Sequence, residues 1–130
     1  MGNIVAVAVG GMIGASARYL FVLAWPNPED GFAQTTFVEN VAGSFLLGLL
    51  LTLILQGWRW RWDIRPLVAV GALGSFTTFS ALTEDVVRLA DDGRAEVAAA
   101  YAVASVVIGL AAAGAGVLSG RVLACRVVRR

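Results

Sequence analysis

The chain has 130 residues, of which 58% are hydrophobic and only 15% charged, and its formal net charge is +1. A soluble domain of this length could not bury so much apolar surface, so the composition favours a membrane protein of one domain. The chain has no histidine and a single cysteine, Cys125. This excludes an intrachain disulfide, histidine-based acid–base catalysis and a His/Cys metal site.

Four apolar segments follow one another along the chain, and each is long enough to cross a bilayer as a helix. They run over about 3–25, 32–56, 66–90 and 95–123, with short connecting loops. The N-terminal segment has no basic leader and no convincing cleavage site, so we interpret it as a retained span. The sequence therefore predicts an all-α membrane protein, a single four-helix domain over residues 1–130.

Glycines recur at close spacing in all four segments. Small residues let membrane helices approach closely, so most of these glycines are expected at helix–helix contacts. They are Gly10, Gly11, Gly14, Gly43, Gly48, Gly71, Gly74, Gly109, Gly114 and Gly116.

Arginine provides all of the positive charge and is divided unequally between the two predicted sides of the membrane. One side carries only Arg88 and Arg94, among several carboxylates. The other carries Arg59, Arg61, Arg65, Arg121, Arg126, Arg129 and Arg130. Because positive residues favour the cytoplasmic side, we expect both termini in the cytoplasm. Tryptophans at the segment ends fit interfacial anchors: Trp25, Trp58, Trp60 and Trp62.

Two charged residues fall inside the first two spans, at similar distances from the loop that joins them. Arg18 and Glu39 are therefore expected at similar depth, where an ion pair would lower the cost of burying either charge. Alternatively, Arg18 extends to the interface alone and Glu39 lines an aqueous vestibule. Asn40 offers amide donors without a net charge, which suits either an anion path or a hydrogen bond between helices.

The third span contains "GALGSFTT", a run of poor helix formers near its middle. Opening a helix there would free backbone carbonyl and amide groups, a recurring way to build an ion site at membrane depth. The alternative is a continuous helix with small residues at a packing contact. In the fourth span, Tyr101, Ser105 and Gly109 share one helix face, which aligns two hydroxyls.

Together, "GGMIGASARYL", "NVAGSFLLGLL" and "GALGSFTTFSAL" resemble the CrcB/Fluc family of fluoride channels, and the resemblance covers essentially the whole chain. It implies a passive, fluoride-selective channel in the plasma membrane, built as an antiparallel dimer of four-helix subunits with a broken third helix. It also implies a structural Na⁺ held by the backbone carbonyls of Gly74 and Thr77. The implied fluoride path uses Asn40, Phe79, Ser80, Tyr101 and Ser105.

Two positions depart from the family pattern. Leu82 stands where a second pore phenylalanine is usual, and Gly109 stands where a further hydroxyl is common. A protein that inserts in both orientations should also show little arginine asymmetry, unlike this chain. We therefore expect a heterodimer with a paired homologue of opposite charge bias, in preference to a homodimer.

Other functions fit the sequence less well. A small proton-coupled exporter would need a carboxylate deep in the first span, which has Arg18 instead. A non-transporting membrane assembly protein would not need a polar break in the third span. An enzyme is not expected, because plausible catalytic groups are lacking.

Overall fold

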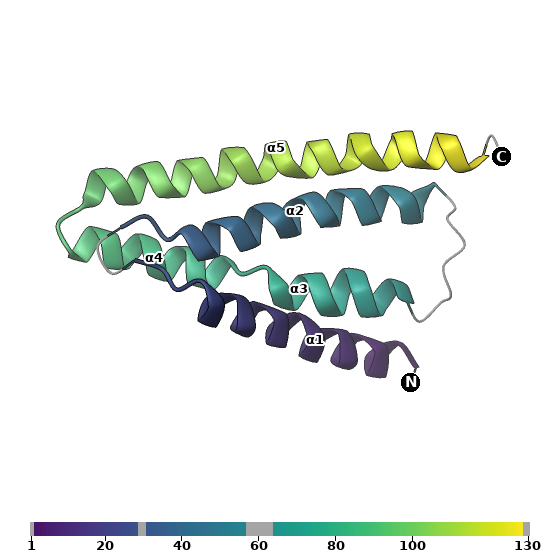
Figure 1. Ribbon diagram of the computed structural model, residues 1–130, viewed down its shortest axis with the longest axis horizontal. Coiled ribbons are helices and arrows are strands. Elements are labelled where there is room, and N and C mark those ends of the chain that lie inside the picture. The colour runs from purple at the N-terminus through teal and green to yellow at the C-terminus, as the bar shows by residue number, and fades with distance from the viewer. Residues whose placement is uncertain (1, 29–30, 57–63, 129–130) are drawn as a thin grey trace.

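The computed structural model describes residues 2–28, 31–56 and 64–128, and these residues form helices joined by short loops (Figure 1). The elements are α1 (Gly2–Ala24), α2 (Gln34–Leu55), the π-helical η1 (Pro66–Ala72), α3 (Leu73–Phe76), α4 (Phe79–Asp91) and α5 (Ala95–Val128). Four stretches of helix are long and apolar enough to cross a membrane: Gly2–Ala24, Gln34–Leu55, Pro66–Asp91 and Ala95–Cys125. The predicted four-helix membrane architecture is confirmed, including the interruption of the third span.

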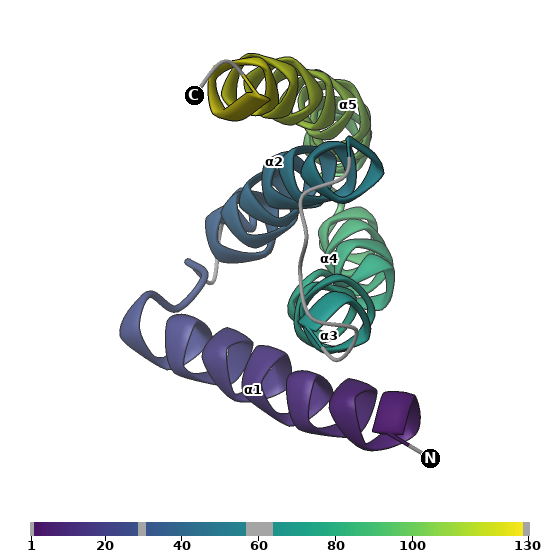
Figure 2. The same cartoon turned by 90° about the vertical axis from the view of Figure 1, so that its right-hand side faces the viewer.

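The spans run antiparallel to their neighbours in sequence, and the described ends of the chain lie at the same end of the molecule (Figure 1). Helix α1 packs mainly against η1 and α3, whereas α2 packs along α5. Viewed from the end, α1 diverges from α2, and the third span lies between them (Figure 2). The third span is therefore the central element, and it contacts the helices on both sides.

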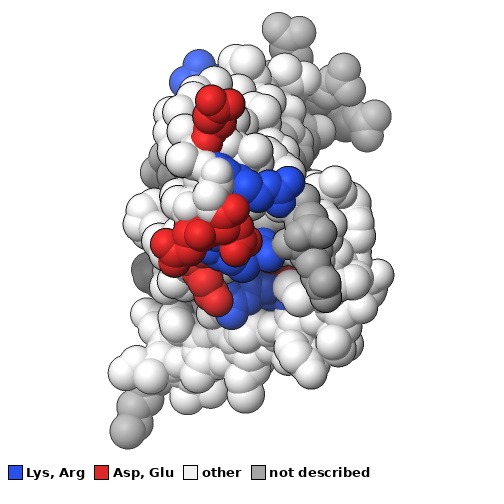
Figure 3. Space-filling model, turned by 90° about the vertical axis from the view of Figure 1, so that its left-hand side faces the viewer, with Lys and Arg blue, Asp and Glu red and all other residues white. Residues whose placement is uncertain are grey.

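The end of the molecule that joins α4 to α5 carries acidic and basic side chains together (Figure 3). Asp91 and Asp92 are exposed there, beside the half-buried Arg94. Of the residues that carry the predicted charge bias and the interfacial anchors, Trp58, Arg59, Trp60, Arg61, Trp62, Arg129 and Arg130 lie outside the described residues.

Glycine forms two close contacts between helices. At the contact of α1 with the third span, a methyl group on Gly10 or Gly14 would collide with the backbone of η1. At the contact of α2 with α5, one on Gly48 or Gly116 would collide with the backbone opposite. The predicted packing role is confirmed at these positions. Gly74 and Gly114 are open instead, because an added methyl group there would meet no atom of the described residues within 4 Å.

The most completely buried residues gather where α2 begins and α4 ends. Leu89 and Tyr101 are 1% and 0% exposed there, and Phe32 meets the Tyr101 ring edge-on with centroids 4.8 Å apart. The loop before α2 is fixed by Thr35, whose amide donates to Asn27 Oδ1 at 2.8 Å and whose hydroxyl donates to the Trp25 carbonyl. Most other apolar side chains on the helices face outward, as expected in lipid or against another subunit.

The first part of the third span is wound more loosely than the sequence pattern indicates. In η1 the chain forms a π-helix, so that the amide of Leu73 donates to the carbonyl of Val68, five residues earlier. The wider turns lie directly against the glycines of α1, where backbone approaches backbone. No residue type marks a π-helix in advance, because the winding depends on the fit to the neighbouring helix.

Candidate ion site at the break in the third span

The third span is interrupted by two residues in extended conformation. Thr77 has φ −79° and ψ 149°, and Thr78 has φ −147° and ψ 123°. Threonine is branched at Cβ and accepts this conformation readily. The break therefore falls at Thr77 and Thr78, one turn after Gly74, which itself lies within the last turn of α3.

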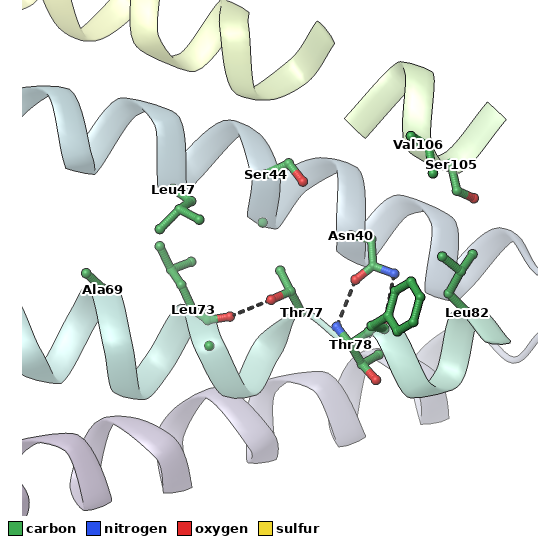
Figure 4. Close-up of a pocket in the computed structure, with 13 residues that line it drawn as sticks. Asn40, Ser44, Leu47, Ala69, Leu73, Thr77, Thr78, Leu82, Ser105 and Val106 are labelled. Carbon is green, nitrogen blue, oxygen red and sulfur yellow. Dashed lines mark hydrogen bonds between the residues drawn. The ribbon is translucent and has the colours of Figure 1, made fainter. Parts of the chain in front are cut away.

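The side chain of Asn40 in α2 pairs with the backbone of the break. Its Nδ2 donates to the carbonyl of Thr78 at 3.0 Å, and its Oδ1 accepts from the amide of Thr78 at 2.9 Å (Figure 4). The Asn40 amide thus pairs with both the N–H and the C=O of Thr78, as a neighbouring strand does in an antiparallel sheet. The hydrogen bond between helices that the sequence offered as an alternative is present, and one of the two Nδ2 hydrogens is left for another acceptor.

The four backbone carbonyls from Gly74 to Thr77 lose their helical partners at the break. In a continuous helix the amides of Thr78 and Ala81 would bond the carbonyls of Gly74 and Thr77. Here the Thr78 amide bonds Asn40, and the Ala81 amide bonds the Thr78 hydroxyl at 3.1 Å, as an N-cap to α4. The carbonyls of Gly74 and Thr77, which the family resemblance implies as cation ligands, are thus among the four that are released.

A cavity of about 320 Å³ opens beside the break, between α2, the third span and α5 (Figure 4). None of the described residues that line it is charged. Ser105 lines it from α5, and its hydroxyl is buried and has no hydrogen-bond partner among the described residues. Phe79 lines the same cavity, yet its side chain is 76% exposed.

The structure brings most of the predicted site residues to this one cavity. Asn40, Gly74, Thr77, Phe79 and Ser105 all line it. Leu82, which stands in the place of the expected second phenylalanine, lines it as well (Figure 4).

Two predicted path residues lie elsewhere in the subunit. Ser80 lines a different cavity, and its hydroxyl is 3.0 Å from that of Thr78. Tyr101 is fully buried, and its hydroxyl donates to Asp85 Oδ2 at 3.3 Å. Asp85 also faces Arg88, at 3.4 Å. The sequence analysis missed Asp85, and the one available signal was a carboxylate on the inner face of an amphipathic helix.

Arg18 and Glu39 line a second cavity, of about 340 Å³, together with Ser80. Glu39 is 2% exposed, and its Oε1 has no hydrogen-bond partner in the described part of the chain. The two residues of the predicted ion pair thus line one cavity, but no salt bridge joins them in the described part of the chain.

These features define a small multi-pass membrane protein with an uncharged polar cavity at a broken central helix, an arrangement typical of ion-conducting proteins. Residues 5–117 match the family described as CrcB-like protein, Camphor Resistance (CrcB), and the chain belongs to this family.

Relatives of the chain are named as ion channels and not as enzymes. The fluoride-specific ion channel FluC 3 of Streptomyces avermitilis is 48% identical over 128 residues, which are 98% of this chain and 63% of that protein. FluC 2 of the same organism is 41% identical over 99 residues, which are 76% of this chain and 63% of that protein. FluC of Agrobacterium fabrum is 41% identical over 124 residues, covering 92% of this chain and 96% of that protein. The chain thus spans less than two thirds of the two Streptomyces proteins.

Proposed function

We propose that this protein is a fluoride-selective channel that lets fluoride leave the cytoplasm passively. The observation that carries the proposal is the uncharged cavity at the break. There the unpartnered Ser105 hydroxyl and the second Nδ2 hydrogen of Asn40 offer donors to an anion. The edge of the Phe79 ring, which is electropositive, adds to this lining. Donors of this kind replace the water around a strongly hydrated anion.

A passive pore is sufficient for export. In acidic surroundings HF crosses the membrane as a neutral molecule and dissociates inside the cell. The anion then leaves through the pore, driven by its gradient and by the inside-negative membrane potential. This direction fits a plasma-membrane location with both termini in the cytoplasm, as the arginine distribution indicates.

A structural Na⁺ fits two of the carbonyls released at the break. Hard cations prefer oxygen ligands, and the carbonyls of Gly74 and Thr77 provide two such oxygens. Two are fewer than a cation of this kind normally takes, so the site needs a second subunit to complete it. Among the described residues, nothing lies within 4 Å of an added methyl group at Gly74, which leaves that side open to a partner.

The partner in this proposal is an antiparallel subunit, and a paired homologue in preference to a second copy. Leu82 lines the cavity in the place of an aromatic ring, so two copies of this chain would lack part of the lining. The arginine bias favours one fixed orientation, and a partner of opposite bias would insert the other way.

Flux from liposomes tests these points together. Protein is reconstituted alone and with a paired homologue, and fluoride efflux is measured with an electrode in the presence and absence of valinomycin. Channel-mediated efflux of the anion requires an accompanying efflux of K⁺ through valinomycin to balance the charge, whereas leakage of neutral HF does not. We expect valinomycin-dependent fluoride efflux, little chloride efflux, and more flux from the mixed sample.

Each part of the proposal has its own contrary result. Equal fluoride and chloride flux would contradict selectivity, and full flux from the chain alone would contradict the heterodimer. Flux that requires a proton gradient would indicate a proton-coupled exporter instead. Replacing Na⁺ by a large organic cation should lower the thermal stability of the dimer, and an unchanged stability would contradict the sodium site.

A further inference from the structure

The second cavity lies directly behind the site at the break. It is lined by α1, α2 and α4, and it contains Arg18, Thr36, Glu39 and Ser80. Thr78 lines both this cavity and the uncharged one. A single extended residue, held by Asn40, therefore separates a cavity with charged walls from a cavity without them.

Neighbouring residues of α2 face the two cavities. Asn40 lines the uncharged cavity and Glu39 the charged one, because consecutive helical residues point about 100° apart. Glu39 is almost completely buried and its Oε1 has no partner among the described residues. No hydrogen bond or salt bridge within the described residues therefore reaches this Glu39 oxygen. Glu39 directly precedes Asn40, whose amide faces the proposed path.

The charges around this carboxylate come from α1 and α4. Arg18 and the phenol of Tyr19 line the cavity from α1, and Glu84 lines it from α4. No residue of α2 other than Glu39, and none of the described residues of α5, adds a charge to this lining. Arg18 is the only cation in the lining that the structure describes, so it is the one positive charge that shares this cavity with Glu39.

We infer that Glu39 and Arg18 act as an opposed charge pair that sets how readily an anion occupies the uncharged cavity. The inference rests on the proposed function and names two residues that determine the rate of fluoride flux. Glu39 repels an anion across the Thr78 partition and Arg18 attracts it, each through protein of low dielectric where charges act over several ångströms. Neither side chain contacts the anion. Both act at a distance, as positioning residues that change the electrostatic energy of the anion in the uncharged cavity.

The two substitutions should change the flux in opposite directions. E39Q, which removes the negative charge but keeps the shape, is expected to raise valinomycin-dependent fluoride efflux by about three- to tenfold at low fluoride, the scale of one charge acting across a partition of this kind. R18Q is expected to lower it by a similar factor. The double variant should return close to the wild-type rate, and E39D should stay near it.

A merely structural ion pair would behave differently, since removal of either partner would then weaken the fold and lower the flux. Thermal unfolding of each purified variant separates the two cases. Matched controls are E96Q and R121Q, which make the same chemical changes at exposed positions of α5 distant from the cavity. Both should leave the rate unchanged.

The outcomes are distinct. Opposite shifts, with the double variant near wild type, support the inference, and an E39Q rate equal to or below wild type overturns it. If E39Q does not fold, R18K replaces it: a normal rate in R18K beside a low rate in R18Q supports the charge pair, and equal losses overturn it. If the wild type shows no fluoride efflux, alone or with a paired homologue, the proposed function fails, and this inference with it.

Discussion

The α2–α5 contact and the break in the third span are both built from residues that weaken an isolated helix, yet the results are opposite. At the contact, Gly48 and Gly116 remain helical and bring backbone against backbone. At the break, Thr77 and Thr78 leave the helix, and the side chain of Asn40 takes over their backbone pairing. Whether such a segment stays helical therefore depends on its partner across the interface. The glycines stay helical against the backbone of another helix, and the threonines leave the helix where a side-chain amide pairs with their backbone.

The strongest test of the α2–α5 contact is a large side chain at Gly116. G116L should abolish recovery of folded protein, because the side chain would have to displace the backbone of α2 at a cost of about 3 kcal/mol or more. The matched control is G114L, two residues away, where the described structure is open around an added methyl group. Size-exclusion chromatography in detergent measures both, and equal recovery would show that the contact is not tight.

The corresponding test of the break is N40A. This change removes two hydrogen bonds and leaves the amide and carbonyl of Thr78 unpaired, so the free energy of unfolding should fall by about 2–4 kcal/mol. N3A, at an exposed position of α1, serves as the control. Thermal unfolding in detergent provides the measurement, and a similar small change in both variants would mean that Asn40 does not hold the break.

A smaller effect is expected from the cap of α4. T78V removes the hydroxyl that accepts from the Ala81 amide and should cost about 1 kcal/mol, while T78S should retain most of the stability. T83V removes the hydroxyl of an exposed threonine in the same helix and should be nearly neutral. Unfolding of T78S as early as T78V would exclude the cap as the cause.

The smallest change in stability is expected at Gly74, which does not lie at a close helix contact as Gly10 does. G74A should leave the stability of the subunit unchanged or raise it by up to about 1 kcal/mol, because alanine favours the helix and meets no neighbour among the described residues. G10A, by contrast, should be clearly destabilising, since its methyl group would collide with η1. Equal losses in the two variants would place Gly74 at a packing contact after all.

The four spans and the break in the third could be predicted from the sequence, because each depends on the composition of a single segment. Hydrophobic length predicts the four spans, and the run of glycine, serine and threonine before Phe79 predicts the break. A hydrogen bond from Asn40 to another helix was one of two open interpretations, since an amide suits an anion and a protein acceptor equally well, but its pairing with the break was not predicted.

The features that escaped prediction all depend on how helices are rotated against one another. The π-helical winding of η1 follows the surface of α1. The burial of Tyr101 on Asp85, and the placement of Ser80 at a different cavity, are set by the rotation of α4 about its axis. Residue type and spacing fix which side chains share a face, but not which cavity that face meets.

The pairing of Asn40 with Thr78 also decides how the third span can move. A helix interrupted at its centre would ordinarily bend there, with the two extended residues as a hinge. Here both backbone groups of Thr78 are tied to α2, and its hydroxyl is tied to the first turn of α4. These hydrogen bonds brace the interruption against bending, so the conduction path that we propose beside it would lie next to a braced segment and not a hinge.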